Sequence, residues 1–263
     1  MPAVSLEFRG PVACLSIDHA QRRNAFTRSM WRSIPALMEQ ISNRASARVV
    51  CLQSAVPGAF AAGADISEFE QIYGHPQVAL EATLEIQRAI EALEKCSLPT
   101  LAAIDGPCVG GGVALAVACD FRLSSDRARF AVTPARLGLS YHPDDLRRLV
   151  LACGHAAASE LLYTGQLWDA QRALAMGLVS QVLELESFQS GVDRVLQAMA
   201  QNSLESLRAI KRGLRAVQSR HEVAWGQAEQ EFIDLFQSQD FREGRDAFLQ
   251  KRPALFPSHI SEA

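Results

Sequence analysis

Short apolar segments alternate with longer amphipathic ones over the first half of the chain, and this alternation most limits the folds available to it. The apolar segments at 12–17, 48–52 and 100–105 have the length and composition of buried strands. Between them, residues 27–43 and 77–95 carry apolar side chains at helical spacing. Strands that alternate with helices in this way predict an α/β core.

The beginning of the chain carries local structural signals. Residues 4–8 alternate between apolar and polar, and a Gly-Pro turn at 10–11 leads into the strand at 12–17, which predicts a β-hairpin. Thr27 is expected to cap the first helix. Pro35 lies inside that helical pattern and predicts a kink or a later helix start.

From about residue 143 the pattern is almost entirely helical. The composition changes near residue 190, which predicts an α/β core at 1–190 and a helical C-terminal region at 191–263. A length of 263 residues suits one large domain with an appendage better than two equal domains. The predicted helical segments are 155–163, 169–176, 187–200, 203–219, 222–238 and 240–250.

Charge and cysteine content exclude several functional classes. With 26 Lys+Arg and 29 Asp+Glu the formal net charge is −3, which argues against nucleic acid as the main partner. The longest apolar stretch, 108–119, is too short to span a bilayer, so we expect no membrane partner. No two of the six cysteines have metal-site or redox-pair spacing. The chain begins without the pattern of a secretion signal, and we expect a cytoplasmic protein with reduced thiols.

Two segments of glycine and other small residues are candidates for binding a ligand through the backbone. Residues 57–65, PGAFAAGAD, follow a predicted strand, and their small side chains leave N–H groups open to a ligand. Asp65 is placed to cap a helix that begins at Ile66. Residues 109–113, VGGGV, open a helix whose unpaired N–H donors suit a phosphate or a developing oxyanion. Each segment alone also fits a tight turn or a close helix–strand contact.

Taken together, the two segments resemble one protein family. PGAFAAGADI followed by AAIDGPCVGGGVALAVACD is similar to the crotonase superfamily of enoyl-CoA hydratases and isomerases, and the likeness continues to the C-terminal FLQKRPALF. The resemblance implies a spiral of ββα units whose helical C-terminal region packs trimers. It also implies an acyl-CoA thioester as ligand, no cofactor beyond the CoA of the substrate, and a homotrimer or a dimer of trimers.

The resemblance assigns roles to individual residues. The backbone N–H groups of Ala62 and Gly111 correspond to the family's oxyanion hole, which polarises the thioester carbonyl. Arg23 and Lys251 are candidates for the CoA phosphates, unless they are only solvated surface charges. The full set expected to bind CoA or substrate is Arg23, Ala25, Ala61, Ala64, Asp65, Ile66 and Lys251.

Two positions depart from the pattern of the family's hydratases. Hydration by the usual route needs two carboxylates, one to activate water and one to manage the proton at C2. The resemblance places the first at Ala114 and, when the following loop is aligned on Gly138, the second at Pro134. Neither residue carries a proton, so the sequence excludes the two-glutamate mechanism.

Three residues that follow Pro134 in the sequence, Tyr141, His142 and Asp145, are candidates for moving a proton. The pattern TPxxLGxxY resembles the methylmalonyl-CoA decarboxylase branch, whose matching Tyr orients the departing carboxylate; here that residue is Tyr141. That branch has a His where this chain has Ala64. His142 stands where dienoyl-CoA isomerases carry an Asp, and a His there could shuttle a proton. Asp145 is a candidate displaced acid for hydration.

Two further interpretations remain open. Asp144 and Asp145 also suit a helix N-cap pair facing Arg147 and Arg148. Because both family acids are missing, the chain is alternatively a non-catalytic protein of the same fold that binds CoA thioesters. The two functions differ in turnover, since an enzyme would convert an acyl-CoA through a stabilised enolate.

Overall fold

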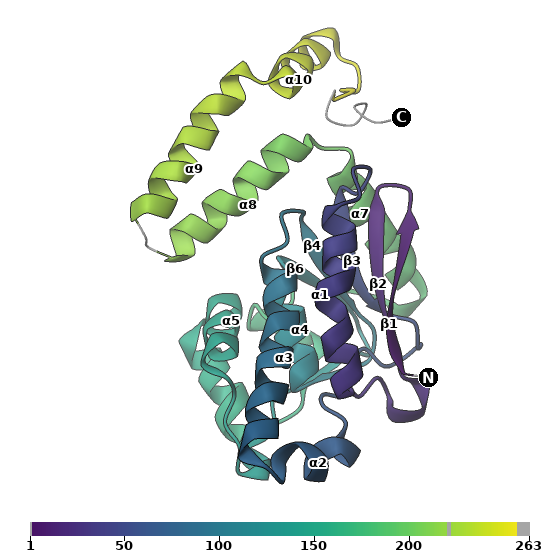
Figure 1. Ribbon diagram of the computed structural model, residues 1–263. Coiled ribbons are helices and arrows are strands. Elements are labelled where there is room, and N and C mark those ends of the chain that lie inside the picture. The colour runs from purple at the N-terminus through teal and green to yellow at the C-terminus, as the bar shows by residue number, and fades with distance from the viewer. Residues whose placement is uncertain (1, 220–221, 257–263) are drawn as a thin grey trace.

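The main sheet of the computed structural model, which describes residues 2–219 and 222–256, has the strand order β1-β2-β3-β4-β6-β9 (Figure 1). β1 and β2 form an antiparallel hairpin, and each later pair of neighbours is parallel. The hairpin predicted from the alternation of apolar and polar residues at the start of the chain is therefore confirmed. The six strands are β1 (Ala3–Arg9), β2 (Val12–Asp18), β3 (Val49–Ser54), β4 (Thr100–Ile104), β6 (Phe121–Ser125) and β9 (Gln181–Leu183).

Helices cover both faces of this sheet because alternate side chains of a strand point to opposite sides. Val50 and Leu52 of β3 pack in one core cluster with α1, α3 and α4. Val49 and Cys51 pack on the other side, against α7. A sheet buried on both faces explains why its strands are continuous apolar runs. The four helices are α1 (Arg28–Ser42), α3 (Pro76–Glu94), α4 (Gly111–Ala118) and α7 (Phe188–Ala200).

A second, three-stranded sheet gives the fold its repeating pattern. Its strands are β5 (Pro107–Val109), β7 (Arg129–Ala131) and β8 (Trp168–Asp169), in the order β5-β7-β8. A strand of the main sheet is followed by a strand of the small sheet and then by a helix, first as β4-β5-α4 and then as β6-β7-α5. These consecutive units confirm the expected spiral of ββα units.

The C-terminal half is helical and ends in an arm that leaves the core (Figure 1). Helix α5 (Pro143–Thr164) is broken at Gly154, whose φ is +79°, and α6 (Ala170–Ala175) follows β8. The arm consists of α8 (Leu204–Ser219), α9 (Glu222–Asp234) and α10 (Gln239–Gln250). The remaining short helices are α2 (Phe69–Tyr73) and the 3₁₀ turns Ala20–Arg22, Ile66–Glu68, Pro134–Leu137, Leu185–Ser187 and Leu235–Gln237. No helix within the described residues is long and apolar enough to cross a membrane.

Several expectations are corrected by long-range packing. Thr27 caps α1 as predicted, but the helix runs through Pro35 without a later start. Strands β8 and β9 interrupt the segment expected to be almost wholly helical, because they pair with β7 and β6 far away in sequence. The division predicted at residue 190 falls inside α7, whose buried side belongs to the core. The arm that leaves the core therefore begins with α8.

Gly106 follows β4 at a backbone position that no other residue can occupy without disturbing the loop that contains Gly58. Its φ is +90°, and a Cβ built on it would lie 2.2 Å from the carbonyl oxygen of Gly58. Gly154 also has a positive φ, +79°, but a Cβ there would meet nothing within 4 Å.

We therefore expect Gly106→Ala to lose more than about 3 kcal/mol of unfolding free energy, or to fail to fold, because strain and a backbone clash add. Gly154→Ala carries the strain alone and is expected to lose about 1–2 kcal/mol. Urea unfolding of the two variants measures the difference. Equal losses would contradict the close approach of the two loops.

Candidate active site

A large, mostly apolar cavity of about 670 Å³ lies between α2, α3 and the beginnings of α4 and α5. Its apolar wall includes Trp31, Phe69 and Ile90. The glycine segments predicted to bind a ligand form one side of it. Of the predicted site residues, those that line the cavity are Ala62, Ala64, Ile66, Gly111, Tyr141, His142 and Asp145.

The two glycine segments, far apart in sequence, are held together by backbone hydrogen bonds. Ala61 N donates to Pro107 O at 3.0 Å, and Val109 N donates to Ala61 O at 2.8 Å. A Cβ built on Gly63 would lie 3.2 Å from Val109 O and 3.9 Å from the Gly111 nitrogen. The segments are therefore in contact, and small residues are required where they meet.

The pattern of backbone bonds determines which N–H groups are open to a ligand. Ala62 N donates to Arg23 O at 3.1 Å, so the prediction that Ala62 supplies an oxyanion donor is wrong for this arrangement. Ala61 uses both its N–H and its carbonyl in pairing with β5, which likewise contradicts its assignment to ligand binding. Within the described residues, the amides of Ala64 and Gly111 have no recorded acceptor.

The geometry of Ala64 follows from its pairing with Phe26. Phe26 N donates to Gly63 O at 2.7 Å and Asp65 N donates to Phe26 O at 2.9 Å, which are the two bonds of a parallel bridge. These bonds use the neighbours of Ala64 and leave its own N–H directed away from Phe26. Ala64 lines the cavity, so its amide is the available donor on this side.

Asn24 joins the early loop to the first glycine segment. It is fully buried and has a φ of +60°, a conformation that Asn tolerates better than most residues. Its Nδ2 donates to Ser54 Oγ at 2.7 Å and to the carbonyls of Ala59 and Phe60 at 3.0 and 3.1 Å. Its Oδ1 accepts from His19 N at 2.7 Å. One side chain thus fixes the loop that positions Ala62 and Ala64.

Tyr141 reaches the N-terminus of α4. Its hydroxyl donates to Gly110 O at 2.9 Å, the same carbonyl that accepts from Val113 N and Ala114 N. Burial raises the pKa of Tyr141 well above its usual value, and the charge of Asp145 raises it further. The phenol is therefore protonated at neutral pH and acts as a hydrogen-bond donor beside Gly111.

The two positions at which the resemblance places carboxylates lie on the cavity wall but have no acidic group. Ala114 and Pro134 both line the cavity. Among the described residues on its wall, Asp145 is the only carboxylate. A mechanism that needs two carboxylates at this cavity is therefore not supported by its lining.

Asp145 is buried at the first turn of α5 and is held from two sides. Its Oδ2 accepts from Gln87 Nε2 at 3.1 Å, and its Oδ1 accepts from Arg148 at 2.8 Å. Burial raises the pKa of Asp145, although the Gln87 hydrogen bond and the Arg148 charge act in the opposite direction. Glu94 binds the other side of Arg148 at 2.6 Å. This arrangement places the one carboxylate of the described wall at a fixed point.

His142, rather than the aspartates, caps α5. Its Nδ1 accepts from Asp144 N at 3.3 Å, and its side chain is 34% exposed. The expected Asp144–Asp145 cap is therefore wrong, because Asp145 turns inward. The predicted pairing of Asp145 with Arg148 is confirmed, whereas Arg147 binds Glu94.

The structure places only some of the residues predicted to contact CoA at the cavity. Ile66 is 69% exposed at the edge of the cavity, while Arg23 is exposed and Ala25 is buried outside its lining. Asp65 caps the turn Ile66–Glu68 as predicted, and the hydrogen bonds of Ser67 hold its pKa below the usual value although burial acts to raise it. Lys251 ends α10, on the arm far from α2 (Figure 1).

Two important wall residues gave no signal in the sequence. Trp31 belongs to the buried face of α1, and a Cβ built on Gly111 would lie 3.1 Å from its ring. Gln87 is an ordinary polar residue in the amphipathic pattern of α3. Only the long-range packing of these helices shows that they form the cavity.

We expect Asn24→Ala to lose about 2–4 kcal/mol of unfolding free energy, because it leaves buried polar groups unpaired and places Ala at a positive φ. Asn43→Ala, at the exposed end of α1, is the matched control and is expected to lose less than about 1 kcal/mol. Chemical denaturation measures both values. A loss at Asn24 no larger than at Asn43 would contradict its role as the joint between the loops.

Comparisons with known proteins agree with this architecture. The profile of the enoyl-CoA hydratase/isomerase family matches residues 7–259. The short-chain-enoyl-CoA hydratase of Clostridium acetobutylicum is 29% identical over 95% of each chain. The mitochondrial methylglutaconyl-CoA hydratase of Mus musculus is 28% identical over 94% of this chain and 79% of its own. An enoyl-CoA hydratase/isomerase family protein from Hyphomonas neptunium has 38% identity and a TM-score of 0.94, with 98% of each chain covered. The chain therefore belongs to the enoyl-CoA hydratase/isomerase family of the crotonase superfamily.

Proposed function

We propose that the protein binds an acyl-CoA thioester and polarises its carbonyl with the amides of Ala64 and Gly111. The observation that carries this proposal is that both amides border the cavity and lack an acceptor within the described residues. An enolate concentrates negative charge on the thioester oxygen, and fixed N–H donors stabilise that charge. The dipole of α4 adds to the effect at Gly111.

The reaction that the cavity supports best is movement of a double bond along the acyl chain. Such an isomerisation needs one base that removes a proton from one carbon and returns it to another. Asp145 is the single carboxylate of the described wall, and its raised pKa suits both steps. Tyr141, whose hydroxyl donates to Gly110 O, holds the start of α4 and so positions the Gly111 amide for the developing oxyanion. His142 contributes less directly in this scheme, because its Nδ1 caps α5.

Decarboxylation is a second candidate, and the Tyr141 loop is the observation that favours it. Loss of CO₂ from an acyl-CoA generates the enolate without a base, and a weak acid such as Tyr141 then delivers the proton. Hydration with Asp145 as a displaced acid is the remaining reaction, and the relatives named as hydratases support testing it.

A panel of three thioesters separates these reactions. We expect conversion of a 3-enoyl-CoA to the conjugated 2-enoyl-CoA, followed by ultraviolet absorbance, to be faster than hydration of crotonyl-CoA or decarboxylation of methylmalonyl-CoA. Asp145→Asn should lower kcat for the isomerisation by about 10²–10⁴-fold, the usual contribution of a general base. Asp144→Asn changes the neighbouring exposed carboxylate and should leave kcat within about twofold.

Equal rates in the two Asp variants would contradict the role of Asp145. Binding of CoA thioesters without turnover of any of the three would instead favour the non-catalytic alternative.

The oxyanion donors are tested by deleting one N–H at a time. An amide-to-ester replacement, made with lactic acid in place of alanine, removes the N–H of residue 64 without changing a side chain. We expect it to lower kcat by about 10²–10³-fold. The same replacement at Ala62 removes the bond to Arg23 O and should mainly cost stability. Both esters also weaken the preceding carbonyl as an acceptor, Gly63 O for Phe26 N and Ala61 O for Val109 N, so each variant loses one N–H and weakens one loop contact. A larger loss of kcat from the ester at residue 62 than from the ester at residue 64 would assign the oxyanion donor to Ala62 instead of Ala64.

We also propose that the arm assembles the protein as a homotrimer or a dimer of trimers. Large apolar side chains on the arm are exposed, with Trp225, Phe232 and Phe248 at 58%, 61% and 83%. An uncovered apolar surface of this kind favours association with other copies. Lys251, at the end of α10, would then contact CoA only in a neighbouring subunit. A cytoplasmic location, with CoA entering only as part of the substrate, remains part of the proposal.

A further inference from the structure

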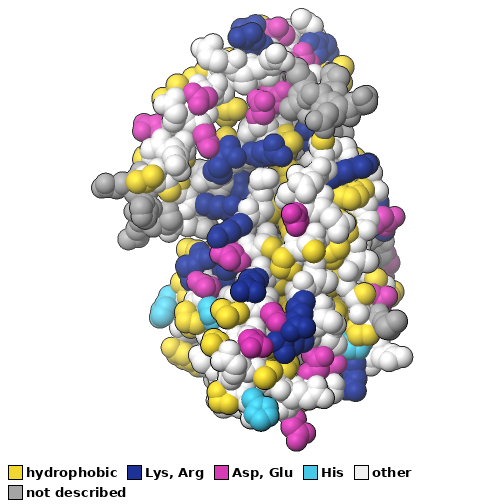
Figure 2. Space-filling model, viewed as in Figure 1, with side chains coloured by type: hydrophobic (Ala, Val, Ile, Leu, Met, Phe, Trp, Pro, Cys, Tyr) yellow, Lys and Arg dark blue, Asp and Glu magenta, His cyan; other side chains and the backbone are white. Residues whose placement is uncertain are grey.

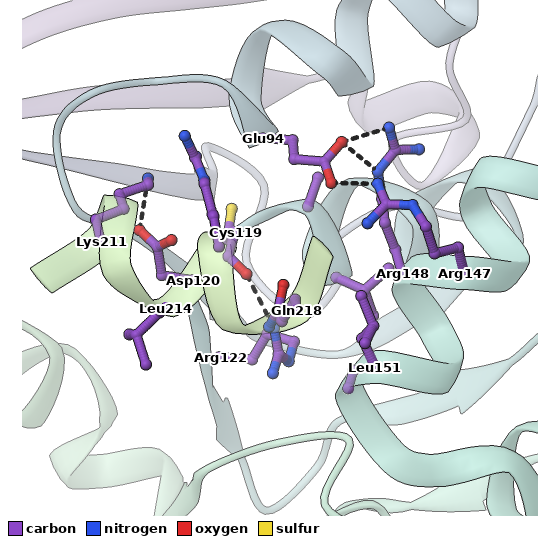
Figure 3. Close-up of a pocket in the computed structure, with 14 residues that line it drawn as sticks. Glu94, Cys119, Asp120, Arg122, Arg147, Arg148, Leu151, Lys211, Leu214 and Gln218 are labelled. Carbon is purple, nitrogen blue, oxygen red and sulfur yellow. Dashed lines mark hydrogen bonds and ion pairs between the residues drawn. The ribbon is translucent and has the colours of Figure 1, made fainter. Parts of the chain in front are cut away.

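A second cavity, of about 160 Å³, lies between the end of α4, the first half of α5 and α8 (Figure 3). Figure 2 shows Lys and Arg side chains gathered where α8 meets the core. The cavity is lined by five cationic side chains and only two carboxylates, so it carries an excess of positive charge. The cations are Arg122, Arg147, Arg148, Lys211 and Arg215.

Both carboxylates of the lining are already engaged. Glu94 binds Arg147 and Arg148 together, as the dashed lines in Figure 3 show. Asp120 accepts from Lys211 Nζ at 2.7 Å and from Thr100 N at 2.7 Å. These pairs leave Arg122 and Arg215 without a carboxylate partner among the described residues.

Arg122 is 8% exposed and has no carboxylate partner among the described residues, whereas the equally buried Arg148 and Lys211 each bind a carboxylate. Its Nε donates to Leu178 O at 2.6 Å and its Nη1 donates to Cys119 O at 3.0 Å. Both acceptors are neutral carbonyls, and no acceptor is recorded for Nη2 within the described residues. Burial lowers the pKa of Arg122, which reflects the cost of removing its charge from water.

Arg215 faces the same cavity from α8. Its Nη2 donates only to Cys96 O, at 3.3 Å. A buried guanidinium and a second, half-buried one thus share a small space in which both carboxylates of the described lining are already paired. Guanidinium groups match the oxygens of phosphate and carboxylate in geometry as well as in charge.

We propose that this cavity is a binding site for a small oxyanion of the phosphate or carboxylate class, held by Arg122 and Arg215. Its volume equals about five water molecules at roughly 30 Å³ each, which is enough for one phosphate group. The ligand is a free ion in solution. The site is separate from the acyl cavity, so it does not depend on the proposed reaction.

The oxyanion site is also connected to the acyl cavity through one ion pair. Arg148 lines the oxyanion site and holds Asp145, which lines the acyl cavity. The negative charge of a bound anion attracts the positive charge of Arg148. The ion pair between Arg148 and Asp145 is then weaker. Occupation of one cavity is therefore felt at the proton-accepting group of the other.

The test uses the full chain and inorganic phosphate, with sodium chloride at matched ionic strength as the control. Isothermal titration calorimetry and thermal unfolding should show saturable binding of phosphate and a rise in Tm that chloride does not produce. Malonate, in a parallel titration, distinguishes carboxylate from phosphate as the preferred anion. Neither measurement requires turnover, so failure here and failure of the proposed reaction are separable.

Arg215→Gln should weaken phosphate binding at least tenfold, because it removes one of the two cations without a carboxylate partner. Arg212→Gln lies on the same helix outside the cavity, where Arg212 pairs with Glu231, and should change binding less than twofold. Gln218→Glu supplies a carboxylate at the cavity and should abolish the response to phosphate. A response equal to that of chloride, or the same loss in the Arg212 and Arg215 variants, would overturn the site. Loss of oligomers in Arg215→Gln without phosphate binding would also overturn it, since an acidic group of a second copy would then occupy the cavity.

Discussion

The contact between two backbone loops is the constraint on which the rest of the site depends. Ala61 pairs with Pro107 and Val109 as if it were one more residue of the small sheet. This pairing brings an N-terminal segment against the N-terminus of α4. It works only with small residues, because a Cβ on Gly112 would lie 2.7 Å from Ala61 O. The fold thereby fixes two free amides before any ligand binds, which is the condition for electrostatic stabilisation of an oxyanion.

The opposite wall of the cavity carries one carboxylate among the described residues. The carboxylates expected at positions 114 and 134 are replaced by apolar residues, while Tyr141 donates to the carbonyl at the start of α4. The remaining carboxylate, on Asp145, comes from α5 and is held by Gln87 and Arg148. One base and one neutral donor form a simpler set than two carboxylates. Such a set supports the proposal that the protein transfers a proton and does not activate a water molecule.

The sequence predicted the parts that depend on local patterns and missed those that depend on distant partners. The hairpin, the cap at Thr27 and the helix opening at Gly111 follow from periodicity and local chemistry. Strands β5, β8 and β9, of two or three residues, exist only because other segments pair with them. The choice between the amides of residues 62 and 64 depends on Arg23 O, which no local pattern reveals. The glycine segments were therefore recognisable, but not the particular N–H that faces the cavity.

The joint between the arm and the core lies beside the cationic cavity. Lys211 anchors α8 by donating to Leu98 O at 2.7 Å and by pairing with Asp120. The cationic cavity lies at this joint, and Arg148 joins its wall to Asp145. A change in the position of α8 alters the surroundings of Arg215 first and those of Arg148 next. Two separate sets of ion pairs therefore line this cavity: Lys211–Asp120 fixes the arm, and Glu94–Arg148–Asp145 fixes the carboxylate of the acyl cavity. Because a buried ion pair is costly to leave half-formed, α8 and the Asp145 carboxylate are each held in place by a set of their own, and the two sets meet only at the cavity between them.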